Sequence, residues 1–336
     1  MAALASGRIV VQLNAYSAYR MWSISESAPD RIARSFPEVR VVQSRDRETF
    51  VRLLAETSVL FTWSLPRPHF ARASALKWVH TPEGGVDRFL YPELAKSEVL
   101  LTNSRGLTSE AVADHALALL LSLSRRLAEC RDAQRARTWA RDLMWSGDRV
   151  PHALTGRVMV VLGAGSIGSA VARRAKACGM TVLALRRRTD EPPPPGADEV
   201  HRLAEIDALL ERADVLVLAL PLTRDTRRIL GAERLARVKP GALLVNIGRG
   251  ELLDEAGLLQ SLAAGRLGGA GLDVFDDEPL PRDNPLWNHP RVVVTPHVAG
   301  TDPGHMERAT ELFESNLGRF LRGEPLVNLV DKSAGY

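Results

Sequence analysis

Short apolar runs alternate with amphipathic stretches through the first hundred residues of the chain. The runs are rich in β-branched residues, and the stretches between them repeat apolar side chains at helical spacing. Such alternation is typical of a parallel sheet with helices on both faces. We predict strands at 8–13, 39–43, 58–63, 77–80 and 99–102, and helices at 28–36, 47–56 and 70–75.

A long helix is predicted next. Ser109 is a typical N-cap residue, and Val112, His115 and Leu119 follow at helical spacing. We expect this helix to run towards Arg137, and residues 139–154, rich in tryptophan and arginine, to form an irregular arm or linker.

A second alternating block occupies the rest of the chain. A last helix, 304–321, carries apolar residues that match no vacant position in this block, so we expect it to cross back to the first domain. The predicted strands are 158–162, 181–185, 214–220, 242–247, 271–275 and 292–295, and the helices are 167–177, 205–212, 232–238 and 253–264.

The pattern predicts an α/β protein with two Rossmann-like, doubly wound parallel-sheet domains, because 336 residues are too many for one ordinary core. The second domain, 106–297 with the long helix and arm at 109–154, is inserted into the first, which comprises 1–105 and 298–336.

Composition excludes several classes of protein. The chain is 45% hydrophobic and 25% charged, as in globular proteins, and no stretch approaches a membrane span. Its net charge is +4, and the arginines are interleaved with acids, so we expect a solvated surface and no nucleic-acid partner. Cys130 and Cys178 fit neither a metal site nor a disulfide framework, and Arg8 and Asn14 interrupt any signal-peptide core. We expect a cytoplasmic protein without metal.

A glycine loop follows the first strand of the second block. Gly163, Gly165 and Gly168, with Ser166 and Ile167 between them, connect a strand to a helix. In a dinucleotide site the first glycine makes the turn, the second admits the pyrophosphate and the third packs helix on strand. The sequence therefore predicts a dinucleotide cofactor.

The next strand ends in Arg186, Arg187 and Arg188. NAD-binding loops place an acid there for the ribose 2′-hydroxyl, whereas a guanidinium binds a 2′-phosphate. Elsewhere a run of three arginines is more often solvated surface. At this position it favours NADP over NAD, although NAD stays possible.

An arginine, an acid and a histidine follow the ends of three later strands. Arg249 suits a carboxylate or a polarised carbonyl, and His297 suits proton transfer if a carboxylate stabilises its imidazolium. Glu278 is our preferred partner because it leads into Pro279, with Asp276 and Asp277 as alternatives. Asp273 precedes them, near the nicotinamide position that we expect. These groups indicate reduction of a 2-keto acid.

The motifs together resemble the D-isomer-specific 2-hydroxyacid dehydrogenases from about Trp78 to Tyr336, and Arg186 resembles the NADPH-dependent glyoxylate/hydroxypyruvate reductase branch. Two departures are Gly248, where alanine or serine is commoner, and Asp114, where glutamate is commoner. The resemblance rests on the glycine loop and on Gly84-Gly85-Val86-Asp87, Val112-Ala113-Asp114-His115, Leu220-Pro221-Leu222-Thr223, Asn246-Ile247-Gly248-Arg249-Gly250, Leu272-Asp273-Val274-Phe275, Glu278-Pro279-Leu280, Thr295-Pro296-His297 and Gly323-Glu324-Pro325.

The resemblance implies a role for each domain and for several residues. Domain 106–297 would bind NAD(P), and domain 1–105 with 298–336 would be the catalytic one. Residues 109–154 would form a homodimer interface, from which Trp139 or Trp145 would reach the partner's pocket. Arg249 and His297 would bind substrate, with His297 as acid/base oriented by Glu278, and the backbone of Gly84 and Gly85 would hold the substrate carboxylate. Three residues, Pro221, Ile247 and Asp273, would line the cofactor site.

We therefore expect NADPH-dependent reduction of a small 2-keto acid, glyoxylate or hydroxypyruvate, in a cleft that domain closure seals from water. In the first domain we expect Trp63, Ser64 and Leu65 to line the substrate pocket. Two alternatives stay open. One is a nucleotide-sensing protein like the corepressors that resemble this family, and the other is a dehydrogenase of another small acid such as formate or phosphite.

Overall fold

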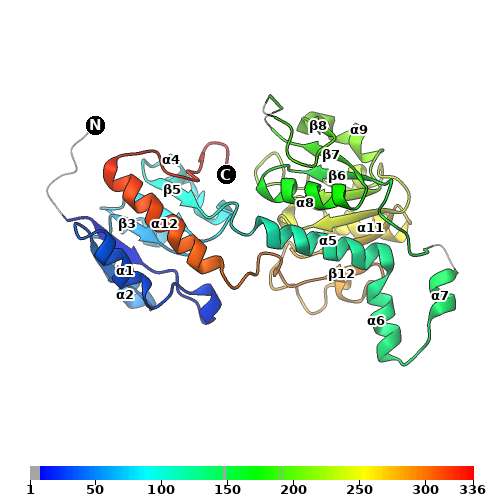
Figure 1. The fold of residues 1–336 in the computed structure, drawn as a ribbon, viewed down its shortest axis with the longest axis horizontal. Helices are drawn as coiled ribbons and strands as arrows, with labels where there is room; N and C mark the ends of the chain where they lie inside the picture. Colours follow the sequence, from blue (N-terminus) through cyan, green and yellow to red (C-terminus); the bar gives the residue numbers. More distant parts are fainter. Residues whose placement is uncertain (1–7, 147–148, 188, 191) are drawn as a thin grey trace. The chain divides into compact units, whose positions relative to one another are not determined.

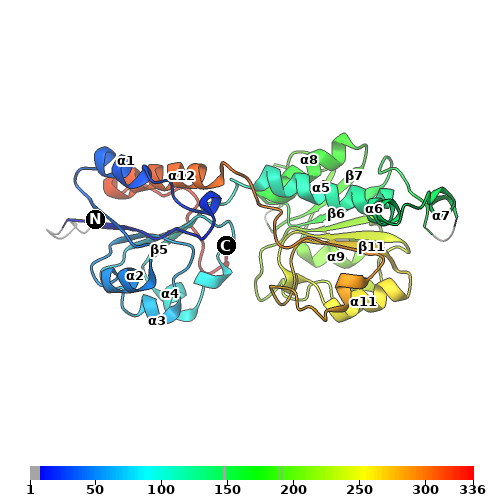
Figure 2. The same cartoon turned by 90° about the horizontal axis from the view of Figure 1, so that it is seen from below.

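The computed structural model describes residues 8–146, 149–187, 189–190 and 192–336. The chain divides into two compact units, one of 1–108 and 302–336 and the other of 109–301. Each is a parallel α/β sheet covered by helices, and Figures 1 and 2 show their elements. None of the helices in the described ranges is long and apolar enough to cross a membrane.

The first unit contains a five-stranded sheet in the order β2-β1-β3-β4-β5, with every pair parallel. Figure 2 shows α1 and α12 on one face of this sheet and α2, α3 and α4 on the other. The elements are β1 (Val10–Leu13), α1 (Ala28–Ser35), β2 (Arg40–Gln43), α2 (Arg47–Leu53), β3 (Val59–Phe61), α3 (Arg67–Phe70), β4 (Trp78–Thr81), α4 (Pro92–Lys96), β5 (Leu100–Asn103) and α12 (His305–Arg322).

The last helix belongs to this first sheet, as the unmatched apolar residues of 304–321 predicted. Phe313 of α12 stacks on Phe61 and Trp78, with ring centroids 4.8 and 5.2 Å apart. These aromatic rings are almost completely buried, and their burial fixes α12 on β3 and β4.

The second unit contains a seven-stranded sheet in the order β12-β11-β10-β9-β6-β7-β8, again with every pair parallel. Figure 2 shows α5 and α8 on one face and α9 and α11 on the other. The elements are α5 (Ser109–Arg125), α6 (Leu127–Arg135), α7 (Arg141–Trp145), β6 (Val158–Leu162), α8 (Ser166–Ala177), β7 (Thr181–Leu185), β8 (Glu199–His201), α9 (Ile206–Leu210), β9 (Val215–Leu218), α10 (Ala232–Leu235), β10 (Ala242–Asn246), α11 (Glu255–Ala263), β11 (Leu267–Leu272) and β12 (Val292–Val294).

Several predicted elements were wrong in extent. The helix predicted at 70–75 lies at 67–70 instead, because Pro68 at its second position favours a helix start. The strand predicted at 271–275 spans Leu267–Leu272, where three glycines hide the strand pattern. Asp273 therefore follows this strand and does not lie in it. The short elements α4, α7 and β8 were not predicted.

The long helix predicted from Ser109 towards Arg137 breaks at Arg126, which adopts a left-handed conformation with φ of 55°. The buried guanidinium of Arg126 donates hydrogen bonds to the carbonyl oxygens of Leu143 and Arg149, at 3.1 and 2.8 Å. This arginine thus holds the arm that carries α6 and α7 against the end of α5.

Candidate functional site

The glycine loop lies between β6 and α8, in the middle of the seven-stranded sheet. A Cβ on Gly163 would lie 2.7 Å from the Ala219 backbone, and one on Gly168 would lie 2.1 Å from the Gly163 carbonyl oxygen. Close packing therefore requires both glycines. A Cβ on Gly165 would have no neighbour within 4 Å, and the first turn of α8 contains no acid. Open space before a helix N-terminus fits a phosphate group.

Arg186 and Arg187 follow β7, next to the edge strand β8. The Arg186 N–H donates to the His201 carbonyl oxygen at 3.0 Å, so β8 extends the pairing to the first arginine. Arg186 is half-buried and Arg187 is exposed. Arg188, the third arginine of the predicted cofactor contact, lies outside the described residues.

Arg249 follows β10 in a turn braced by Asn246. The Asn246 side chain accepts the Gly248 N–H at 3.1 Å and donates to the Arg249 carbonyl oxygen at 2.9 Å. A Cβ on Gly250 would lie 1.9 Å from the Phe275 backbone, so this turn packs directly on the loop after β11. Gly248 is less constrained, since its Cβ would lie 2.9 Å from a methyl of Leu252, the end of a flexible side chain.

His297 and Glu278 form the central pair of the site, with 2.7 Å between Nδ1 and Oε2. The other oxygen of Glu278 accepts the Phe275 N–H at 3.1 Å, which fixes the carboxylate. Of the two alternative acids, Asp276 pairs with Arg228 at 2.6 Å, and Asp277 is exposed. Geometry thus favours Glu278 as the partner of the histidine.

The hydrogen bond between His297 and Glu278 shifts the pKa of each group in the direction that favours its charged form. The hydrogen bond to Glu278 raises the pKa of His297, against burial and the charge of Arg249. Burial alone would raise the pKa of Glu278, but its hydrogen bonds with His297 and the Phe275 N–H bring that pKa below its ordinary value. The positive charge of Arg249 lowers both pKa values.

Comparison with known proteins identifies the chain. Residues 117–299 match the family model "D-isomer specific 2-hydroxyacid dehydrogenase, NAD binding domain". A glyoxylate reductase of Thermococcus gammatolerans is 34% identical over 303 residues, which are 88% of this chain and 86% of that protein. The chain belongs to the D-isomer specific 2-hydroxyacid dehydrogenase family. It is therefore an NAD(P)-dependent oxidoreductase with a nicotinamide cofactor.

Solved structures of this dehydrogenase family share the fold. One is the NADPH-dependent glyoxylate/hydroxypyruvate reductase of Sinorhizobium meliloti in complex with NADP and sulfate, with a TM-score of 0.79, 30% identity and coverage of 98% of this chain and 100% of that one. Another is a family member of Xanthobacter autotrophicus in complex with NADPH and MES, with a TM-score of 0.79, 29% identity and coverage of 98% and 99%. The prediction of two Rossmann-like domains, one inserted into the other, is confirmed.

Other residues predicted for this dehydrogenase lie in several places. Ile247 is buried after β10, and Pro221 is exposed after β9. Gly84 and Gly85 belong to the first unit, where the Gly84 carbonyl oxygen accepts from the Asn103 amide at 2.6 Å. Their contact with a substrate carboxylate stays a prediction.

The carboxylate of Asp273, which we predicted to contact the cofactor, accepts several hydrogen bonds from the protein itself. It is 1% exposed and accepts from the Thr295 hydroxyl at 2.6 Å, the Val298 N–H at 3.0 Å and the Ala299 N–H at 2.9 Å. Its contact with the nicotinamide stays a prediction.

Sequence reasoning missed the residues that brace the dehydrogenase site. Asn246 holds the arginine turn. Asp273 is contacted by Thr295, which directly follows β12, and by His115 of α5. The sequence carries a weak signal for them, since each lies within a segment that resembles the family. Their contacts depend on tertiary packing and leave no local pattern.

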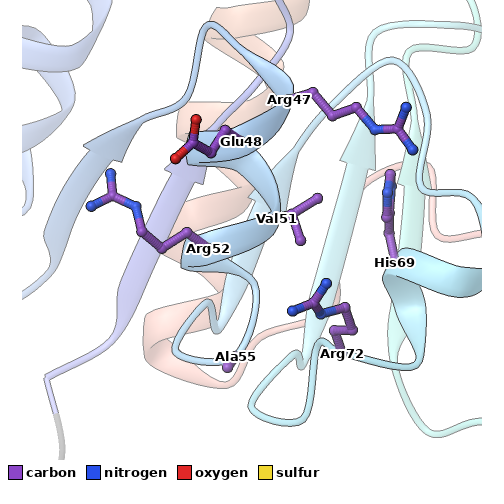
Figure 3. Close-up of a pocket in the computed structure, with 7 residues that line it drawn as sticks. All are labelled: Arg47, Glu48, Val51, Arg52, Ala55, His69 and Arg72. Atoms are coloured by element: carbon purple, nitrogen blue, oxygen red, sulfur yellow. The ribbon is translucent and has the colours of Figure 1, made fainter.

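A separate open groove lies between α2 and α3 of the first unit (Figure 3). Arg47 reaches across it towards His69, whereas Arg52 extends from the other side of α2. It contains none of the predicted site residues, so this concavity is not the dinucleotide site. Its lining comprises Arg47, Glu48, Val51, Arg52, Ala55, His69 and Arg72.

Proposed function

We propose that this enzyme reduces a small 2-keto acid of the glyoxylate or hydroxypyruvate type with NADPH. The observation that carries the proposal is the 2.7 Å pair of His297 and Glu278, together with the Arg249 turn that packs on the loop after β11. Relatives named glyoxylate reductase and the NADP complex of the Sinorhizobium meliloti reductase support it.

His297 is the proton donor in this proposal. Its Nδ1–H donates to Glu278, which leaves Nε2 to protonate the keto oxygen as it becomes an alkoxide. Reduction consumes one proton, so the competent form is the imidazolium that Glu278 stabilises. The reverse oxidation needs the neutral ring to accept that proton.

Arg249 binds the substrate in this proposal. Its planar guanidinium donates to a carboxylate and to the developing alkoxide. Its stabilising effect increases as negative charge accumulates on the keto oxygen. Asn246 and Gly250 fix the backbone of the turn, and the guanidinium itself donates to the Gly248 carbonyl oxygen at 2.9 Å.

The residues present fit the nicotinamide cofactor. Open space over Gly165 and the N-terminus of α8 would receive the pyrophosphate, and Arg186 and Arg187 would pair with a 2′-phosphate. When bound, NADPH supplies the hydride that reduces the carbonyl carbon. Two charge-assisted contacts to the 2′-phosphate favour NADPH over NADH.

The enzyme is a homodimer in this proposal, with the arm as the interface. Trp139, Leu143 and Trp145 are 88%, 57% and 69% exposed, and a second copy of the chain would bury them. Light scattering of the wild type and of a Trp139→Ser, Trp145→Ser variant tests this. A monomeric wild type would contradict it.

A screen of 2-keto acids with NADPH and NADH tests the activity. We expect glyoxylate or hydroxypyruvate with NADPH to give the highest kcat/KM. Formate or phosphite oxidation, or NADPH binding without turnover of any acid, would overturn the proposal, and the last result would favour a nucleotide-sensing protein. His297→Asn is the matched control, because it keeps the fold and removes the proton donor.

A further inference from the structure

The segment that carries His297 folds around one buried carboxylate. Asp273 accepts from Thr295 on one side of the histidine and from the backbone N–H groups of Val298 and Ala299 on the other. The His297 N–H itself donates to the Asp273 carbonyl oxygen at 2.9 Å. The loop is thus fixed at four points to one residue.

The carboxylate of Asp273, which only accepts, determines the direction of each hydrogen bond. The Thr295 hydroxyl lies 2.6 Å from Asp273 Oδ1, and a carboxylate oxygen only accepts, so the hydroxyl is the donor. Its oxygen then accepts from His115 Nε2 at 2.9 Å, which places the ring hydrogen on Nε2. His115 Nε2 is also 3.5 Å from Asp273 Oδ1. A directed chain therefore runs from His115 through Thr295 to Asp273.

This chain of hydrogen bonds stabilises a backbone conformation at His297 that a histidine seldom adopts. His297 has φ of 52°, in the left-handed region that residues with a Cβ seldom occupy. Such conformations persist where the surroundings over-determine them, as the bonds on both sides of His297 do here. Loss of one bond should let the loop relax away from Glu278.

The position of His115 depends on the glycines of β11. A Cβ on Gly271 would lie 2.9 Å from the Leu119 Cβ, and one on Gly269 would lie 3.1 Å from a Leu123 methyl. These leucines follow His115 at helical spacing, so the glycines let this stripe of α5 approach β11 closely. That approach brings the imidazole to Thr295.

We propose that His115, Thr295 and Asp273 are positioning residues that hold His297 against Glu278. The inference rests on the proposed function, in which His297 donates the proton, and it adds residues that act through the histidine without touching the substrate. His115 and Thr295, which have no predicted contact with the cofactor, should govern kcat more than KM or cofactor affinity.

Two pairs of variants test the chain. Thr295→Val and His115→Leu remove the hydrogen-bonding group, while Thr295→Ser and His115→Gln keep one. We expect the first two to lower kcat by about 10- to 100-fold, because a shift of about 1 Å in a catalytic group has that effect. KM and the Kd for NADPH should change less than about threefold, and the conservative variants should recover most of kcat.

Thr310→Val is the matched control. Thr310 is buried in α12 of the first unit and donates to the Met306 carbonyl oxygen at 2.7 Å. It should lose stability as Thr295→Val does, with kcat unchanged. Equal losses of kcat in both variants would mean a general structural effect and would overturn the inference.

The second readout does not need turnover. The His297 ring, followed by NMR in protein labelled at histidine Cε1, should titrate at least roughly half a unit lower in Thr295→Val. An unchanged His297 titration in Thr295→Val overturns the positioning role even if the wild type is active. A wild type that reduces no keto acid overturns the proposed function, while a shifted titration would still support the positioning role.

Discussion

Replacing Glu278 by glutamine tests the His297 pair with the smallest change of shape. Oε1 of the acid already accepts the Phe275 N–H, so the glutamine oxygen takes that bond and its NH2 faces His297 Nδ1. A donor at that place requires Nδ1 to accept. The substitution therefore favours the neutral imidazole over the imidazolium, which is the form that protonates the keto oxygen in the proposed reaction.

The structure bounds the size of the effect. Two unit charges about 4 Å apart interact by about 4 kcal/mol at an effective dielectric constant of about 20 and by about 1 kcal/mol in water. The side chains are 45% and 29% exposed, so solvent screening selects the lower part of that range. At about 1.4 kcal/mol per unit, the pKa of His297 should fall by about one unit.

The assay is the pH profile of reductive kcat/KM with NADPH. The pKa of His297 is raised in the folded protein, so activity should hold below that pKa and fall as pH rises through it. Glu278→Gln should move this limb about one unit lower. Asp277→Asn, which removes an exposed acid of the same loop, is the control and should leave the limb in place. An unmoved limb in Glu278→Gln would refute our account of the pair.

Three further predictions concern cofactor, substrate and stability. Arg186→Asp should lower the ratio of kcat/KM for NADPH to kcat/KM for NADH by about 30-fold, because it removes one charge-assisted hydrogen bond of about 2 kcal/mol. Equal kcat/KM for the two cofactors in the wild type would refute the assignment. Arg249→Ala should lower kcat/KM by about 10²–10³, with partial recovery in Arg249→Lys, and wild-type kinetics would place the pocket elsewhere. Burial lowers the pKa of His80 to about 3, so the unfolded chain binds this proton first and stability falls as pH drops below about 6.5. At pH 5 the loss of unfolding free energy is about 2 kcal/mol, and His80→Gln should remove it. The check is the Tm of both proteins between about pH 7 and pH 5, and an equal fall of Tm in the wild type and in His80→Gln would contradict the prediction.

The sequence could predict which candidate residues come together because parallel sheets bring the ends of distant strands to one edge. Arg249, Glu278 and His297 follow β10, β11 and β12, which are neighbours in the sheet. The strands have clear apolar patterns, so the polar residues that follow the end of each strand could be located without a structure. The choice between Glu278 and the two aspartates could not, since it depends on side-chain direction within one loop.

The parts that escaped prediction share a physical cause. β8 is three residues long at a half-exposed edge, and the glycines of β11 erase the alternation that marks a strand. Both elements matter for the site, because β8 pairs with Arg186 and the β11 glycines admit α5 and His115. Close backbone approach is what a functional edge needs, and it selects residues with little local pattern. The weakest sequence signals in this chain therefore coincide with the contacts that place its proposed reacting groups.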